Sequence, residues 1–141
     1  MGEGKGGGLN DDRARRTFRF VAATYNYGYV PLPLILAPTR ELADQIYVNV
    51  REYAKYTGLR AAVVFGGVDI APQIAALRQG AEVVIATPGR LLDHVGQRTI
   101  SLATADVFVM DEADRMLDMG FLPDIQRIIN LLPPVRQNLM F

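Results

Sequence analysis

The chain has 141 residues, the usual size of one domain, and half of them are hydrophobic, which is enough for one sizeable core. Fifteen basic and fifteen acidic residues give a formal net charge of zero. This balance argues against a mainly electrostatic nucleic-acid binder, although a domain can still grip a few phosphates through loops and helix N-termini. The chain has no cysteine, which excludes disulfides and cysteine-ligated zinc. His94 is the only histidine, so no histidine pair can hold a metal, and a solvated or capping role is expected for it.

The amino-terminal segment differs in composition from the rest of the chain. Residues 1–16 are rich in glycine and then in charge, without an apolar period, and predict a flexible tail. Residues 17–33 contain "TFRFVAATYNY", which predicts an atypical strand followed by a turn. The chain shows neither the apolar stretch of a secretory signal nor an apolar run long enough for a membrane span. A cytoplasmic protein without membrane contact is therefore expected.

From Leu34 onward, short apolar runs alternate with segments of helical periodicity. Runs of this kind are typical of strands buried on both faces of a parallel sheet. The predicted strands are "LILAP", "AAVVFGG", "EVVIATP", "DVFVMD" and "QNLMF". The predicted helices carry Leu42, Ile46, Val50 and Tyr53, then Ile70, Ile74 and Leu77 before Gly80, then Leu91, Leu92 and Val95 after Pro88, and lastly "FLPDIQRIINLL" before Pro133 and Pro134. The alternation predicts an α/β fold of three layers with a mainly parallel sheet.

Acidic residues follow the predicted strand "DVFVMD". Ligands of such sheets bind beyond the carboxyl ends of the strands, so Asp111 is expected at that edge, where its carboxylate can hold Mg²⁺ through water. Glu112 is displaced by one residue and is suited to polarise an attacking water, and Asp114 could anchor neighbouring loops. A plainer alternative is an acidic helix start, where carboxylates complement the helix dipole.

Three further polar segments follow predicted strands: "PTRELA" (residues 38–43), "GG" (residues 66–67) and "TPGR" (residues 87–90). Each offers backbone N–H groups, a hydroxyl or a guanidinium at a junction between a strand and a helix. This arrangement is typical of phosphate binding.

Each of these segments also has a plainer explanation when it is taken alone. Arg40 could pair with Glu41 or Asp44, and the two glycines could simply form a turn. Thr87 could be an N-cap, and Arg90 could be a solvated helix residue. Four motifs in this order, at successive strand ends, are nevertheless a specific combination.

The chain resembles the DEAD-box ATP-dependent RNA helicases of superfamily 2 in four motifs: "APTRELADQ", "GG", "ATPGRLLDH" and "VMDEADRMLDMGF". The sequences of these motifs are most similar to those of the bacterial members. The resemblance covers residues 34–141 and implies part of the first RecA-like domain. It implies that Asp111 and Glu112 serve Mg²⁺, ATP and the hydrolytic water, and that Asp114 links the ATP site to the RNA side. It also implies contacts with the RNA sugar-phosphate backbone, and thus sequence-independent binding, for Pro38, Thr39, Arg40, Gly66, Gly67, Thr87, Gly89 and Arg90.

Three parts of the family pattern have no match in these 141 residues. The family's Walker A loop, G-x-x-x-x-G-K-[ST], and its adenine-reading glutamine motif are absent, and the only Gly-Lys pair is Gly4–Lys5. The second RecA-like domain, with its arginines for the γ-phosphate, is absent as well. Each such charged contact is worth orders of magnitude in rate. We therefore expect a truncated or rearranged helicase relative that binds RNA weakly and, although the family uses ATP and Mg²⁺, does not turn over ATP alone.

Two alternatives remain open at this stage. The chain could be a non-catalytic module that binds RNA or an intact helicase, or a structural chain without a selected function. In the family's sheet, the strand that leads to the Walker A loop lies beside the strand corresponding to "QNLMF". Residues 17–24 are expected to take that vacant position or to pair with a second copy, which would give a symmetric homodimer.

Overall fold

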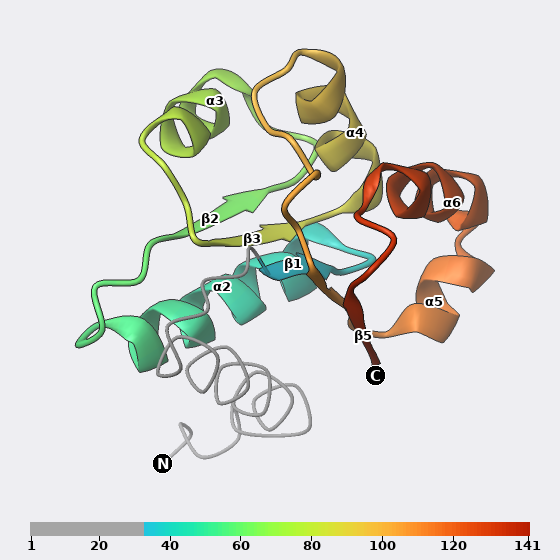
Figure 1. Cartoon of the computed structure of the whole chain (residues 1–141), viewed down its shortest axis with the longest axis horizontal. Coiled ribbons are helices and arrows are strands. Elements are labelled where there is room, and N and C mark those ends of the chain that lie inside the picture. Colours follow the sequence, from blue (N-terminus) through green and yellow to red (C-terminus); the bar gives the residue numbers. More distant parts are fainter. Residues whose placement is uncertain (1–32) are drawn as a thin grey trace.

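The computed structural model describes residues 33–141, which fold into alternating strands and helices (Figure 1). Each predicted strand from Leu34 onward and each predicted helix is present. Their bounds are β1 (Pro33–Leu36), α2 (Arg40–Ala54), β2 (Ala61–Val64), α3 (Ala71–Arg78), β3 (Val83–Ala86), α4 (Pro88–Gly96), β4 (Val107–Met110), α5 (Ala113–Asp118), α6 (Leu122–Leu131) and β5 (Gln137–Met140). The short helix α5 was not predicted as an element of its own.

The five described strands form one sheet in the order β2-β3-β1-β4-β5, and every pair is parallel. Strand β1 lies at the centre, where Leu34 is in register with Val84 on one side and with Phe108 on the other. The predicted parallel α/β architecture is therefore confirmed. Because all strands run in one direction, the segments that follow them emerge at the same edge of the sheet.

Both faces of the sheet are covered, which makes three layers. Along β1, Leu34 and Leu36 pack into a core that includes residues of α4 and α6. Ile35, between them, packs into a second core with Ile46 and Val50 of α2. Figure 1 shows the same arrangement, with α3, α4 and α6 on one side of the sheet and α2 on the other. This two-sided burial explains why the strands are uniformly apolar.

The ends of several helices follow from local sequence. The side chain of Thr39 caps α2 by accepting a hydrogen bond from the backbone N of Leu42 at 3.2 Å. Prolines stand in the first turn of α3, α4 and α6, where the missing N–H costs nothing. After α3, Gly80 takes a φ of 96°, which favours glycine.

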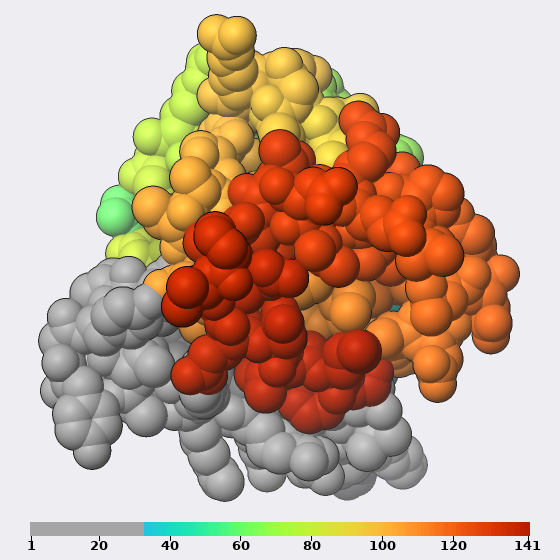
Figure 2. All heavy atoms as spheres, turned by 45° about the vertical axis from the view of Figure 1, so that its right-hand side comes forward, coloured from blue at the N-terminus to red at the C-terminus, as the bar shows by residue number. Residues whose placement is uncertain are grey.

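The segment from α5 to the C-terminus forms one continuous surface, coloured orange to red in Figure 2. No helix within residues 33–141 is long and apolar enough to cross a membrane. The predicted flexible tail (residues 1–16), the atypical strand and the proposed strand exchange of residues 17–24 lie outside the described residues, apart from Pro33. In the described sheet, β2 and β5 are the two edge strands.

Candidate functional site

The four motif segments lie side by side at the carboxyl edge of the sheet. The strand order places them, from one side to the other, as residues 66–67 after β2, residues 87–90 after β3, residues 38–40 after β1 and residues 111–114 after β4. Backbone hydrogen bonds tie each segment to its neighbour. The N–H of Thr87 donates to Val64 (3.1 Å), that of Ala37 to Ala86 (2.9 Å) and that of Asp111 to Leu36 (2.9 Å).

Arg40 and the glycine pair come together at this edge. Gly67 has a φ of 83°, and a Cβ placed there would lie 3.6 Å from Nη1 of Arg40. The Arg40 guanidinium carbon also lies 6.0 Å from the centroid of the Phe65 ring. The alternative pairing of Arg40 with Glu41 exists only as a contact of 3.9 Å between two exposed side chains, which contributes little. Arg40 therefore presents an exposed cation beside the glycine loop.

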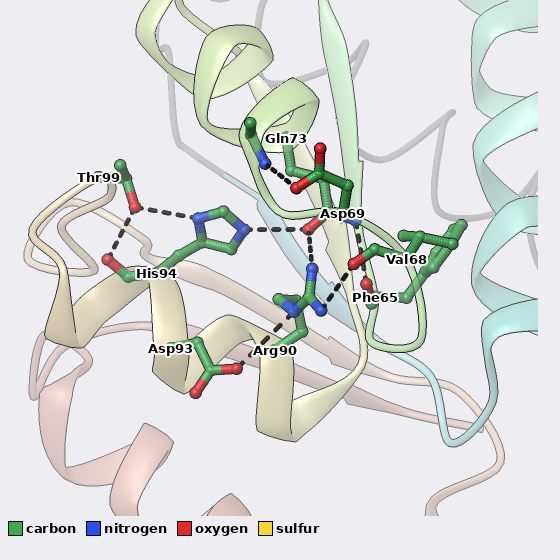
Figure 3. A network of polar contacts seen from close by, with 9 residues as sticks. Phe65, Val68, Asp69, Gln73, Arg90, Asp93, His94 and Thr99 are labelled. Carbon is green, nitrogen blue, oxygen red and sulfur yellow. Dashed lines mark hydrogen bonds and ion pairs between the residues drawn. The ribbon is translucent and has the colours of Figure 1, made fainter.

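Arg90 is held inside the fold. Its Nη1 donates to Oε1 of Gln73 (3.1 Å), its Nη2 donates to the carbonyl of Val68 (3.0 Å), and its Nε lies 3.7 Å from Oδ2 of Asp93 (Figure 3). Its side chain is only 13% exposed. The alternative of a solvated helix residue is therefore wrong. Arg90 instead fixes the loop that follows the two glycines.

Gln73 connects this arginine to the buried His94. The side-chain amide of Gln73 donates to the carbonyl of Phe65 at 3.0 Å, so its Oε1 is the atom that accepts from Arg90. Nε2 of His94 lies 3.1 Å from the same Oε1. Because that oxygen can only accept, Nε2 must carry a proton. Neutral His94 then has a lone pair at Nδ1, 3.0 Å from the hydroxyl of Thr99. This hydroxyl also lies 2.9 Å from the carbonyl of His94 and can donate its one hydrogen to either acceptor.

His94 is completely buried, so the expected solvated or capping role is wrong. Burial, assisted by the positive charge of Arg90, lowers the pKa of His94 below its ordinary value of 6.5, while Asp93 acts weakly in the opposite direction. The neutral ring therefore serves as a fixed hydrogen-bonding bridge between α3, α4 and the segment that follows α4. We call the four residues Gln73, Arg90, His94 and Thr99 the glutamine network.

The acidic segment after β4 is compact and strained. Asp111 is 3% exposed. Glu112 adopts the left-handed conformation (φ 54°, ψ 51°), which is unfavourable for a residue with a side chain, and its Oε1 lies 3.4 Å from Nη1 of Arg115. The N–H of Ala113 donates to the carbonyl of Phe141 at 3.1 Å, so the end of β5 supports this turn. Asp114 is exposed in the first turn of α5, so the acidic helix start is also present.

The other predicted residues are placed at the same edge with different exposure. Pro38 is buried, Thr39 is half-buried as the cap of α2, and Thr87 is half-buried at the start of α4 without a side-chain hydrogen bond to that helix. Gly66 and Gly89 are exposed, and a Cβ at either would meet no atom within 4 Å. Thr87 is thus the N-cap residue of α4 in position and backbone conformation, but its hydroxyl makes no capping hydrogen bond to that helix.

The described residues fit ATP and Mg²⁺ only in part. Mg²⁺ usually keeps several waters and uses one or two carboxylates, and Asp111 and Glu112 supply these at the end of β4. No three His, Cys, Asp or Glu side chains within residues 33–141 come together as metal ligands, and Asp111 has little open surface. The sequence contains no G-x-x-x-x-G-K-[ST] loop to cradle phosphates. Within residues 33–141, Asp111 and Glu112 are therefore the side chains that could hold the metal.

The chain has a parallel sheet with loops suited to phosphate binding at its carboxyl edge. This arrangement is typical of the α/β domains that bind nucleotides or nucleic acids at that edge. The family model of the DEAD/DEAH box helicases matches residues 21–141, and the chain belongs to this family. The predicted family membership is thus confirmed.

Known relatives agree with this assignment. The ATP-dependent RNA helicase DBP2 of Mycosarcoma maydis is 53% identical over 111 residues, which cover 79% of this chain and 20% of that protein. The DEAD-box ATP-dependent RNA helicase 24 of Oryza sativa subsp. japonica is 47% identical over 111 residues, covering 79% and 14%. The chain thus spans a fifth or less of these two relatives. Because they come from a fungus and a plant, the expected closeness to bacterial members stays a prediction.

A solved structure supports the fold. The crystal structure of a hypothetical ATP-dependent RNA helicase from Sulfolobus tokodaii superposes with a TM-score of 0.79 at 31% identity, covering 100% of this chain and 38% of that one. Together with the parallel sheet, this confirms the predicted RecA-like fold.

Sequence reasoning missed Gln73 and misjudged His94. Gln73 lies outside the four motifs, whereas His94 is the last residue of "ATPGRLLDH", and the two residues are 21 positions apart in the sequence. A usable signal was present for His94, because it follows Leu91 by three residues and therefore shares its helix face, which is the buried one. No comparable signal marked Gln73, which stands among alanines on a helix of low amphipathicity.

Proposed function

We propose that residues 33–141 act as the RNA-facing part of the first RecA-like domain of an ATP-dependent RNA helicase. The observation that supports this role most directly is the alignment of the glycine pair, the Thr87–Arg90 segment and the Pro38–Arg40 segment on three adjacent strand ends. These segments offer exposed backbone, hydroxyls and the exposed guanidinium of Arg40. Such groups recognise phosphate and sugar and do not distinguish bases, so the RNA binding would be sequence-independent.

The two arginines of this surface have different roles, because only Arg90 is held in the glutamine network. Arg40 is exposed and meets the ligand, whereas Arg90 is nearly buried and holds the carbonyl of Val68. Arg90 is therefore proposed as a positioning residue for the glycine loop. Substituting Arg40 should weaken RNA binding directly, and substituting Arg90 should do so by releasing the loop.

The proposal is tested by RNA binding of the purified chain at several salt concentrations. We expect weak binding, and we expect Arg40→Ala to weaken it further and to reduce the salt slope by about 0.7, the share of one phosphate contact with a single strand. Arg78→Ala is the matched control, because Arg78 is an exposed arginine in the last turn of α3, far from the start of that helix where the glycine loop lies. Equal effects of the two substitutions, or binding that ignores salt, would contradict the proposal.

We further propose that these 141 residues alone do not hydrolyse ATP, whether RNA is present or not. The reason is the absence of a Walker A loop from their sequence. A phosphate-release assay checks this. Turnover that disappears with Asp111→Asn or Glu112→Gln would show that the chain has an ATPase site and would overturn this part of the proposal.

A further inference from the structure

We propose that the outer edge of β2 is a docking groove for an extended peptide segment of a partner protein. The peptide would add as one more strand beside β2. It would place basic residues near Asp44 and Asp69, apolar residues along the strand, and acidic residues near Arg51 and Lys55. The groove meets the RNA-facing edge at Arg40, but its backbone pairing along β2 does not depend on the proposed function.

Within residues 33–141, no strand pairs with the outer side of β2. Strand β2 is an edge strand of the described sheet and pairs only with β3. The carbonyls of Arg60 and Val64 accept hydrogen bonds from Val83 (3.2 Å) and Thr87 (3.1 Å), so the even-numbered residues of β2 face β3. In a parallel ladder the alternate residues then point their N–H and C=O groups outward. Ala61 and Val63 therefore offer backbone groups to an added strand.

A continuous groove runs along this edge. Its middle is a hollow of about 420 Å³ whose lining includes Tyr47 of α2, Val63 and Phe65 of the strand, and Pro72 and Ala76 of α3. It shares Tyr47 and Ala76 with a hollow of about 500 Å³ at one end, and Phe65 with a hollow of about 300 Å³ at the other. The three hollows together are lined by residues on both sides of β2, from Gly58 before the strand to Asp69 after it.

The middle of the groove is apolar. Val68 is 42% exposed, and the rings of Tyr47 and Phe65 are each half-buried. Alternate side chains of an added strand would point towards α2 and α3 in turn, since successive residues of a strand face opposite sides. Small apolar or β-branched side chains suit this space. Main-chain hydrogen bonds would supply affinity, and the alternate side chains would supply selectivity.

The two ends of the groove carry opposite charge. Arg51, Lys55 and Arg60 line one end, and nearby Glu52 and Glu82 pair with two of them, so one positive charge is in excess. At the other end the lining carries Glu41 and Asp44 against Arg40, and Asp69 lines the neighbouring middle hollow. A peptide with basic and acidic ends complements this polarity. Single-stranded RNA does not complement the whole groove, because beyond Arg40 it would meet the carboxylates of Asp44 and Asp69.

The test uses three synthetic peptides that share a middle of alternating valine and threonine. One carries lysines at one end and glutamates at the other, and the two controls carry lysines at both ends or glutamates at both ends. Binding is measured by fluorescence anisotropy, and the contact is located by amide chemical shifts in NMR spectra. We expect the mixed peptide to bind at least about tenfold more tightly than either control and to shift the amides of Ala61 and Val63.

Two changes examine the backbone pairing itself. Val63→Pro removes an outward N–H, which an edge strand tolerates, and should abolish binding, whereas Val63→Thr keeps the N–H and should retain it. N-methylation of the middle residues of the mixed peptide blocks pairing without altering the protein and should also abolish binding. Equal binding of all three peptides, or retained binding after N-methylation, would each overturn the proposal.

Discussion

Replacing Gln73 by methionine fills nearly the same space but removes three hydrogen bonds from the glutamine network. The lost partners are the carbonyl of Phe65, Nη1 of Arg90 and Nε2 of His94. Each is left in a different environment. His94 is completely buried, the side chain of Arg90 is 13% exposed, and Phe65 lies half-buried at the start of the glycine loop.

The magnitude follows from these environments. A buried donor or acceptor that loses its partner costs about 1–3 kcal/mol. The full cost applies to His94, because water cannot reach its Nε2–H. The N–H of Arg90 and the carbonyl of Phe65 can form hydrogen bonds with water instead, so their cost is smaller. We therefore expect Gln73→Met to lower the free energy of unfolding by about 2–4 kcal/mol.

Urea unfolding of the chain measures this change. Gln126→Met is the matched control, since Gln126 is an exposed helical glutamine of α6, and its effect should stay within about 0.5 kcal/mol. In a chain that already carries His94→Leu, the completely buried Nε2–H is no longer there to lose its partner. There, Gln73→Met should cost at least about 1 kcal/mol less. A cost that is the same with and without His94 would refute the role assigned to the Gln73–His94 hydrogen bond.

Three other predictions concern individual features. Burial lowers the pKa of His94 below 6.5 in the folded state, so the unfolded state takes up a proton first as the pH drops, and stability should fall below pH 6.5. Urea unfolding of the unchanged chain and of His94→Leu should show a smaller fall in the variant. Gly67→Ala should cost about 1–2 kcal/mol because of the left-handed φ of 83°, while Gly66→Ala, in open space, should not destabilise the fold, and thermal melting of the two variants decides this. The homodimer expected through an open sheet edge should appear in light scattering as twice the chain mass, and a monomer at all concentrations would contradict it.

Much of the fold could be predicted because strands that are buried on both faces appear in the sequence as continuous apolar runs. The runs around Leu34 and Val84 are apolar at every position, and Pro88 and Pro133 mark where helices begin or end. Segments that follow parallel strands must share one edge, so the gathering of the four motifs also followed from topology. These features depend on local pattern and on chain direction alone.

The fate of individual polar side chains could not be predicted in this way. Arg90 was given a phosphate-binding role or a solvated one, yet it bonds to residues 17 and 22 positions away in sequence. Burial of a polar group depends on which partner stands opposite, and sequence spacing does not reveal that partner. The strained φ of Glu112 was missed for a related reason, because the turn is held by Phe141, which approaches from a distant strand.

The bonds that join the motif segments to one another have a consequence for how such a surface can change. The links of Ala37 to Ala86, of Thr87 to Val64 and of Asp111 to Leu36 are all made by main-chain atoms. Any residue except proline can donate them, so the spacing of the loops does not depend on the side chains that the loops carry. This edge is therefore suited to protein engineering as a rigid frame, on which new side chains can be grafted at exposed positions such as Arg40 and Gly89 while the frame keeps its geometry.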